Sequence, residues 1–419
     1  MHFMVLCYKI WRIKMNLFQK IKSWLFKKNI KNKMLCEKNQ QLLLELLARK
    51  SPQVPGILLV ANKLQKIGGV ETRIRALTDA LQHAGYQVYI LTEINGNQFE
   101  INANLLEFSF TASNFEQVLC AAIEKLKIKV VEFQCKNVSF LRQLDLDKLK
   151  KYAVCGCTIH FCGKLPFREI RQLDYRIFIS ERMKAWYRKK IPYDLKNAIF
   201  YNGTNILPAT WKFAAQKRAI YISRIGKAYR PKIEQFIKFC QQNNLDFHIA
   251  GDGRNQDIVQ EIRKTLSKKY GFPENRFIGA INVLEYLAEN SSEYLFAAGV
   301  GQVVLECSVF GMPVLVLSDL SLADATFVTP ENYSFFQNRN FTIRGHKNVI
   351  RNRNLEHVAD YPIRKQLAED RDQVKISAAY VDFIKTFLQL LIPDRKFRLS
   401  QIYFCKKMAA GKIYLPPPF

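Results

Sequence analysis

The stretch Ala298–Leu317, AGVGQVVLECSVFGMPVLVL, predicts a glycine turn, a short helix and a buried strand in succession. Gly299 and Gly301 leave the backbone free to approach a ligand closely. The short helix is expected to end at Gly311, a residue that readily adopts the left-handed cap conformation. The apolar run Val314–Leu317 then suits a strand that is covered on both faces. This succession is typical of an α/β domain.

Glu306 is the one acidic residue between Tyr294 and Ser318, and it lies on the expected short helix. One interpretation places it on the solvent face of that helix. The other gives it to a ligand held at the glycine turn, because a carboxylate can accept two hydrogen bonds from a ribose diol. We favour the second interpretation.

This stretch resembles the donor-site signature of GT-B glycosyltransferases, in particular glycosyltransferase family 4 (the group 1 glycosyltransferases). In that signature a glycine-containing loop, a helix with a glutamate and a G-x-P-V turn hold the nucleotide sugar. The matching residues are Gly299, Gly301, Glu306, Gly311, Pro313 and Val314. The family often carries another glutamate eight positions earlier, where this chain has Ala298. The resemblance therefore does not supply that glutamate's role near the transferred sugar.

Length and composition indicate a large globular protein with an acidic partner. A chain of 419 residues can hold two ordinary domains, and 48% hydrophobic residues is typical of globular proteins. The formal net charge of +28 indicates nucleic acid, anionic lipid or a phosphorylated substrate as a partner. The ten cysteines follow no regular framework, which indicates a reducing compartment.

The first 50 residues stand apart by their charge. No acidic residue precedes Glu37, whereas nine Lys or Arg fall between Lys9 and Lys33. Within residues 15–33 the apolar side chains share one face of a helix, which is typical of an interfacial helix on an anionic membrane. That apolar face consists of Leu17, Phe18, Ile21, Trp24 and Leu25. A disordered basic tail is the alternative, and nucleic acid is disfavoured because no aromatic stacking pattern accompanies the charges.

The first domain is expected to open with a strand, a glycine loop and a helix from Pro55 onward. Gly68 and Gly69 would place backbone N–H groups at the N-terminus of that helix, where an anion can bind. In family 4 a similar G-G-V/A-E loop faces the donor diphosphate or the acceptor, and Gly68, Gly69, Val70 and Glu71 match it. Alternatively, Glu71 only complements the helix dipole.

His160 follows an expected strand at residues 153–157. In the family, a histidine in this part of the domain often contacts the donor sugar, so His160 is a candidate; a buried structural histidine is the alternative. Cys155, Cys157 and Cys162 surround it, but this spacing lacks the paired C-x-x-C knuckles of zinc sites. We therefore predict no metal site.

The second domain is expected to begin with the strand Arg218–Ser223, with Arg224 at its carboxyl end, where ligands bind in open parallel sheets. The segment SRIGKAYRPK resembles the family's G/S-R-L…K segment, whose arginine and lysine hold the donor diphosphate. Arg224 matches the arginine, and either Lys227 or Lys232 matches the lysine. The resemblance thus makes His160, Arg224 and Lys232 the candidate catalytic residues.

Together these features predict an α/β protein of GT-B fold, with two Rossmann-like domains whose parallel sheets face across a cleft. The resemblance itself covers about residues 55–320. We expect a basic N-terminal segment at 1–50, an acceptor domain at 51–210, a nucleotide-sugar donor domain at 211–385, and a tail at 386–419 that packs back on the first domain.

The resemblance implies transfer of a sugar from a nucleotide-diphosphate sugar to an acceptor hydroxyl, with retention and without a metal or another cofactor. Charge and resemblance together favour a cell-envelope glycan or lipid-linked acceptor, such as lipopolysaccharide or capsule. They also favour a cytoplasmic enzyme held peripherally on the inner face of the cytoplasmic membrane. An inverting GT-B transferase, a non-catalytic GT-B protein and, less favoured, a nucleic-acid-binding protein are the alternatives.

Overall fold

The structure is a computed structural model in which two compact units can be described. The described residues are 33–46, 48–49, 51–64, 69–95, 104–107, 109–110, 112–135, 139–160, 166–188, 190–191, 197–206, 211–212, 217–253, 255–317, 325–342, 354–355, 359 and 362–390. Residues 1–65, 81–157 and 163–175 make the first unit, and residues 66–80, 158–162 and 176–419 make the second. Gly68, Cys162, the amphipathic stretch before Lys33 and the tail beyond Leu390 lie outside the described residues.

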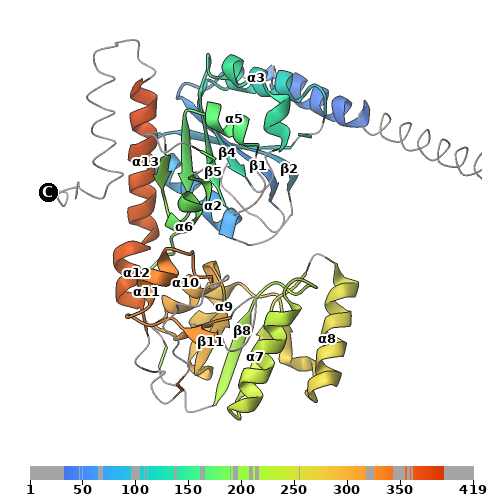
Figure 1. Ribbon diagram of the computed structural model, residues 1–419. Coiled ribbons are helices and arrows are strands. Elements are labelled where there is room, and N and C mark those ends of the chain that lie inside the picture. The colour runs from blue at the N-terminus through green and yellow to red at the C-terminus, as the bar shows by residue number, and fades with distance from the viewer. Residues whose placement is uncertain are drawn as a thin grey trace, which may run out of the picture. The chain divides into compact units, whose positions relative to one another are not determined.

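The first sheet has the strand order of a dinucleotide-binding domain. In the described part of the chain it runs β3 (Asn104–Glu107), β2 (Gln87–Asn95), β1 (Gly56–Leu64), β4 (Ile128–Cys135), β5 (Val154–Ile159), β6 (Tyr175–Phe178) and β7 (Asn197–Ile199) (Figure 1). The order 3-2-1-4-5-6 is that of the Rossmann fold. Residues 57–60 of β1 are at most 1% exposed, because helices cover both faces of a parallel sheet.

The helices of this sheet follow the apolar periodicity of the sequence. They are α2 (Gly69–His83), α3 (Phe115–Lys125), the 3₁₀ helix η1 (Ser139–Gln143), α4 (Leu146–Leu149), α5 (Phe167–Gln172) and α6 (Glu181–Tyr187). The apolar face of α2, which includes Val70, Ile74, Leu77 and Leu81, is buried. Ser180 caps α6, since its side chain accepts a hydrogen bond from the Met183 N–H.

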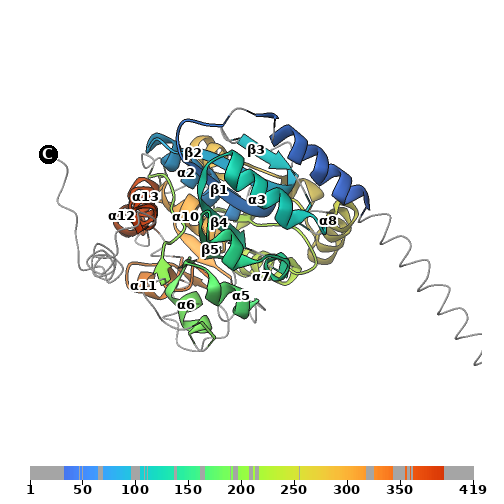
Figure 2. The ribbon, with the colours of Figure 1, turned by 90° about the horizontal axis from the view of Figure 1, so that it is seen from above.

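A helix at residues 33–46 lies beside α3 (Figures 1 and 2). Asn39 fixes it there, because its side chain donates to the Ser109 carbonyl at 3.1 Å and accepts from the Ser109 N–H at 2.8 Å. Leu42 and Leu46 of the same helix are buried. Residues 33–46 therefore fold with the first unit, although the sequence pattern groups them with the basic segment.

The second sheet repeats the order of the first. In the described ranges it runs β10 (Phe277–Gly279), β9 (Asp246–Ala250), β8 (Arg218–Ile222), β11 (Phe296–Gly299), β12 (Val314–Val316) and β13 (Thr326–Phe327). Counted from β8, this is again the order 3-2-1-4-5-6. At one edge of this sheet the short β13 pairs antiparallel with β12, while the other described strand pairs are parallel.

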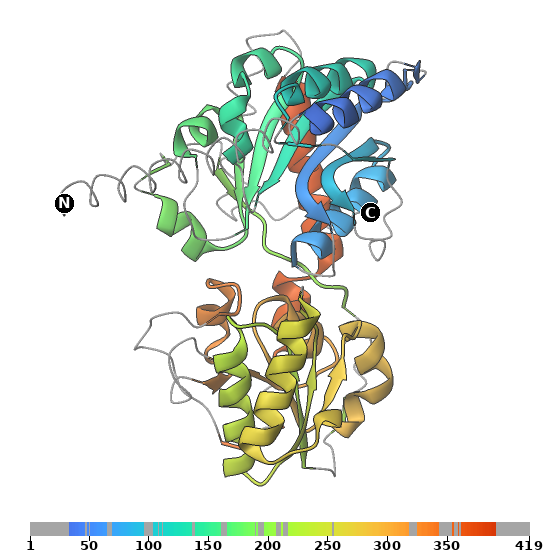
Figure 3. The ribbon, with the colours of Figure 1, turned by 90° about the vertical axis from the view of Figure 1, so that its right-hand side faces the viewer.

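Helices cover both faces of the second sheet. They are α7 (Arg230–Gln242), α8 (Gln256–Tyr270), η2 (Glu274–Arg276), α9 (Val283–Asn290), η3 (Ser291–Glu293), α10 (Gln302–Ser308), α11 (Tyr333–Gln337) and α12 (Arg364–Asp370). Figure 3 shows α7 and α8 side by side over one face, and they share one apolar core with it. Residues of α9, α10, α11 and α12 form the core on the other face.

The last helix of the described residues, α13 (Gln373–Leu390), packs on Phe200, the residue that follows β7. The rings of Tyr380 and Phe383 meet the ring of Phe200 at centroid distances of 5.8 and 5.3 Å. Across the described residues, no helix has both the length and the apolar character needed to cross a membrane.

Candidate functional site

The predicted residues of the second domain converge on the point where its strand order reverses. β8 and β11 are neighbours and run parallel, and Arg224 follows the first while Gly299 ends the second. A Cβ at Gly299 would lie 2.6 Å from Val303 Cγ1 and 3.1 Å from the Ile222 carbonyl oxygen. The two loops therefore meet closely because residue 299 has no side chain. Ligands of open α/β sheets bind at this position.

Gly301 sets the conformation of the turn before α10. Its φ is +64°, in a region that side-chain-bearing residues rarely adopt, and it is the N-cap of the helix. Its N–H donates to the Phe341 carbonyl oxygen at 3.0 Å. Gly311, three residues after the helix ends, has the positive φ that the sequence predicts for it, +84°.

Glu306 lies on α10 and is buried, with 9% of its surface exposed, so the solvent-facing interpretation is wrong. Burial raises the pKa of its carboxyl to about 7, although a hydrogen bond from Gln302 acts in the opposite direction. The group therefore changes charge near neutral pH. When ionised, it is a strong acceptor for hydroxyl donors from a ligand.

Gln302 connects Glu306 to another segment of the second unit. Its Nε2 donates to the Gly203 carbonyl oxygen at 3.1 Å, and its side chain also hydrogen-bonds Glu306 one turn along the helix. A Cβ at Gly69 would lie 3.9 Å from Gln302 Cβ and 3.5 Å from Asn202 Nδ2. Sequence reasoning missed Gln302, although its spacing of four residues from Glu306 was an available signal.

The candidate cations lie between β8 and the first turn of α7. Arg224 and Lys227 are exposed in the connecting loop, and Lys232 is half-buried on the helix. The neighbouring turn supports this loop, because a Cβ at Gly251 would lie 1.7 Å from the Ser223 carbonyl oxygen. Gly251 thus serves close backbone packing, while Arg224 and Lys227 remain accessible to an anion.

The first-sheet candidates occupy the ends of two elements. His160 follows β5 directly and is half-buried, and Gly69 begins α2. Glu71, in the first turn of α2, is 6% exposed, so its side chain is more deeply buried than a helix-dipole acid requires. In the part of the chain that the structure describes, no group of three or more His, Cys, Asp or Glu is arranged to hold a metal ion.

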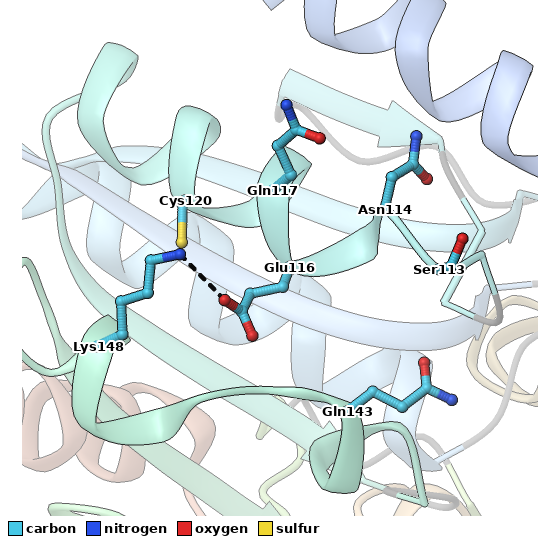
Figure 4. A pocket seen from close by; sticks show the side chains of 7 residues that line it. All are labelled: Ser113, Asn114, Glu116, Gln117, Cys120, Gln143 and Lys148. Carbon is cyan, nitrogen blue, oxygen red and sulfur yellow. Dashed lines mark hydrogen bonds and ion pairs between the residues drawn. The ribbon is translucent and has the colours of Figure 1, made fainter.

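A separate open pocket of about 500 Å³ lies in the first unit (Figure 4). Its lining is polar and comes from Ser113, Asn114, Glu116, Gln117, Cys120, Gln143 and Lys148. Figure 4 shows Lys148 reaching across to Glu116, at 3.1 Å, beside the Cys120 thiol. Burial raises the pKa of that thiol, which keeps it protonated and unreactive. No residue singled out from the sequence lines this pocket.

Comparison with known proteins identifies the fold. The sequence matches no family model and none of the curated proteins. The structure is similar to a glycosyltransferase from Rickettsia africae ESF-5, with a TM-score of 0.58 and 12% identity over 82% of this chain and 100% of the other. It is also similar to Alr3699/HepE of Anabaena in complex with UDP and glucose, with a TM-score of 0.57 and 12% identity over 79% of this chain and 100% of the other.

A third similar structure is the apo form of the lipopolysaccharide outer core galactosyltransferase WaaB, with a TM-score of 0.52 and 11% identity over 79% of this chain and 99% of the other. These identities are low, so the likeness lies in the fold. The two Rossmann-ordered sheets and this likeness together agree with the expectation from the donor-site signature. The chain has the GT-B fold of these glycosyltransferases, built from two Rossmann-like domains.

Proposed function

We propose that this chain is a glycosyltransferase that moves a sugar from a nucleotide-diphosphate sugar to an acceptor hydroxyl, with retention of configuration. The observation that carries the proposal is Glu306, a buried carboxylate one helical turn from a glycine turn at the switch point of a Rossmann sheet. A buried carboxylate in an apolar core costs stability once it ionises, and such groups cluster at functional sites. The GT-B fold supplies the context in which that ligand is a nucleotide sugar.

Each residue at the switch point has a proposed role. Glu306 accepts hydrogen bonds from the ribose diol of the donor. Gly299 and Gly301 let the backbone approach the donor closely. Arg224, with Lys227 or Lys232, holds the diphosphate.

Arg224 and its partner lysine contribute most to the transfer step, because they stabilise the leaving group. As the bond between the anomeric carbon and the diphosphate oxygen breaks, the electron pair stays on the departing nucleoside diphosphate. Arg224 and one lysine offset this growing negative charge. The acceptor hydroxyl forms the new bond to the anomeric carbon and gives its proton to the departing diphosphate oxygen, which lies on the same face of the sugar when configuration is retained. Following the family resemblance, we assign the helix start at Gly69 to the diphosphate or the acceptor, and His160 to the transferred sugar.

The acceptor that we propose is a cell-envelope glycan or a lipid-linked oligosaccharide. The similarity to WaaB, a lipopolysaccharide outer core galactosyltransferase, supports this class. The basic segment at residues 15–33 supports a cytoplasmic enzyme that attaches to the inner face of an anionic membrane.

One observation favours a second candidate, a non-catalytic protein that binds nucleotide sugars. Ala298 stands where the family often has a glutamate, and it is fully buried in β11. Such a protein would bind the donor without releasing nucleotide. Release of nucleoside diphosphate in the presence of acceptor separates the two candidates, and the anomeric configuration of the product separates retention from inversion.

The test is a thermal-shift screen of nucleotide sugars, beginning with UDP-glucose and UDP-galactose. A ligand at 100 times its Kd stabilises the folded state by about 2.7 kcal/mol. Glu306→Gln should lose most of this stabilisation, whereas Glu289→Gln, which changes an exposed acid on α9, should keep it. The absence of any stabilising nucleotide sugar, or equal stabilisation of both variants, would contradict the proposal.

A further inference from the structure

Arg371 is a fully buried arginine between α12 and α13, with 0% of its surface exposed. Its Nη1 donates to the Asn202 carbonyl oxygen at 3.3 Å, and its Nη2 donates to the Gln337 carbonyl oxygen at 3.0 Å. The guanidinium carbon also lies 3.9 Å from the centre of the Tyr201 ring and 5.3 Å from that of Phe341. A buried guanidinium is costly, so these contacts indicate what it is kept for.

The two backbone segments that Arg371 joins are the ones that support the glycine turn. One is residues 337–341, whose Phe341 carbonyl accepts the Gly301 N–H at 3.0 Å. The other is residues 202–204, whose Gly203 carbonyl accepts from Gln302 Nε2 at 3.1 Å. The turn before α10 is therefore held at two consecutive residues, each by one of these segments.

The backbone and the side chain of Arg371 hold different segments in place. The Thr204 N–H donates to the Arg371 carbonyl oxygen at 2.8 Å, and the Gln373 N–H donates to the Thr204 carbonyl oxygen at 3.0 Å. The backbone thus fixes residues 202–204 against the start of α13. The guanidinium then ties residues 337–341 to the same place, through Gln337 and the Phe341 ring.

We propose that Arg371 is a positioning residue that holds the 337–341 and 202–204 segments together and thereby fixes the glycine turn and the direction of the Glu306 carboxylate. The inference rests on the proposed function, in which Glu306 receives the ribose of the donor. When the two hydrogen bonds of the Arg371 guanidinium are lost, Gln302 is no longer aligned with both Gly203 and Glu306. Glu306 then loses the hydrogen bond that favours its ionised form.

The test compares Arg371→Lys with Arg176→Lys in the full-length protein. Arg176 is a matched control because it is 2% exposed, lies in β6 and directs its Nη1 to Asn197 Oδ1 at 3.5 Å. Both variants should lower Tm. Only Arg371→Lys should also raise the Kd for UDP, by about tenfold, which corresponds to losing one hydrogen bond to a charged group. It should in addition move the pH midpoint of UDP binding upward from about 7.

A milder variant covers the case in which Arg371→Lys does not fold. Tyr201→Leu removes the ring beneath the guanidinium at a half-buried position, and it should shift the affinity and the pH midpoint in the same direction by less. Wild-type affinity and midpoint in Arg371→Lys, or an equal loss in Arg176→Lys, would overturn the proposal.

A ligand-free measurement separates this inference from the proposed function. The titration of Glu306 is followed as the carboxylic-acid infrared band that Glu306→Gln removes. Arg371→Lys should raise the pH at which this band disappears, and Arg176→Lys should leave that pH unchanged. If the wild type binds no nucleotide, the proposed function fails, and this titration alone decides whether Arg371 positions Glu306; an unchanged titration in Arg371→Lys refutes it.

Discussion

Replacing Glu306 by glutamine should stabilise the ligand-free protein, and only above the pH at which the carboxyl ionises. Burial raises the pKa of Glu306 from 4.5 in the unfolded chain to about 7 in the folded one. The folded state therefore holds the proton more tightly, and stability falls as the pH rises from 4.5 to about 7. Below this window the neutral acid contributes no penalty, and above it the penalty is complete.

The size of the penalty follows from the same pKa. Each pKa unit corresponds to about 1.4 kcal/mol, so a rise from 4.5 to about 7 costs at most roughly 3–4 kcal/mol of unfolding free energy. Glutamine keeps the shape and the hydrogen bond to Gln302 but never ionises. In a domain of this size, each kcal/mol shifts Tm by about 2–4 °C. Glu306→Gln should therefore raise Tm by several degrees above pH 7 and have little effect below pH 4.5.

Scanning calorimetry of the ligand-free protein at the two pH values tests this expectation. Glu289→Gln is the matched control, because it makes the same chemical change at an exposed position of the same unit. The same Glu306→Gln protein should bind UDP more weakly, since the carboxylate is the proposed ribose acceptor. The reasoning is refuted if Glu306→Gln lowers Tm at both pH values, or if Glu289→Gln reproduces its pH-dependent gain.

Three further predictions concern the cations, the metal and the membrane. Arg224→Ala should lower turnover by about 10² to 10³, the usual loss in rate when one charge-stabilising group is removed. Lys238→Ala, on the exposed face of α7, should leave turnover unchanged. Equal rates of the two variants in a coupled assay of UDP release would show that Arg224 is not part of the site. EDTA should leave turnover intact, and complete loss that manganese restores would contradict a cation-only diphosphate site. Full-length protein should sediment with anionic vesicles in a salt-sensitive way, since each lysine of residues 15–33 contributes about 1 kcal/mol of binding free energy. A chain that starts at Met34 should not sediment with them. Equal binding of both proteins would show that the segment does not bind the membrane.

The truncation in that last experiment begins at Met34 because of a feature that the sequence pattern did not reveal. Residues 33–46 continue the basic segment in the sequence, yet Asn39 binds the Ser109 backbone and buries the helix against the first unit. A cut at Ser51 would remove buried Leu42 and Leu46, and so would test stability and not membrane binding.

Strands and helices with strong local patterns could be predicted from the sequence. The apolar run of β1, the helical face of α2 and the cap at Ser180 carry their signals within a few residues. The edge strands β3 and β13 could not be found in this way, because they are short and exist through their pairing with β2 and β12. The prediction that Glu306 serves a ligand rested on a lone acid beside a glycine turn and on the family resemblance, and the structure adds its burial.

The long-range contacts of Gln302 and Arg371 could not be predicted from the sequence, for a physical reason. Gln302 acts on Gly203, which is 99 residues away, and Arg371 acts on Asn202, which is 169 residues away. Both recognise backbone carbonyl oxygens, and these are the same in every residue type. A single sequence therefore contains no side-chain pattern that would mark either contact.

The pairing of Glu306 and Arg371 in one network argues for a ligand more strongly than either residue does alone. Each is a buried ionisable group, and the described contacts include no ion pair between them. They are connected through hydrogen bonds, because Gln302, which hydrogen-bonds Glu306, also donates to Gly203, and Arg371 donates to the neighbouring Asn202. Apolar side chains of similar volume would make such a core at least as stable. Two buried ionisable groups near one glycine turn therefore lower the stability of the ligand-free protein, which is typical of a functional site. The bound donor offsets this loss, because its hydroxyls donate hydrogen bonds to Glu306.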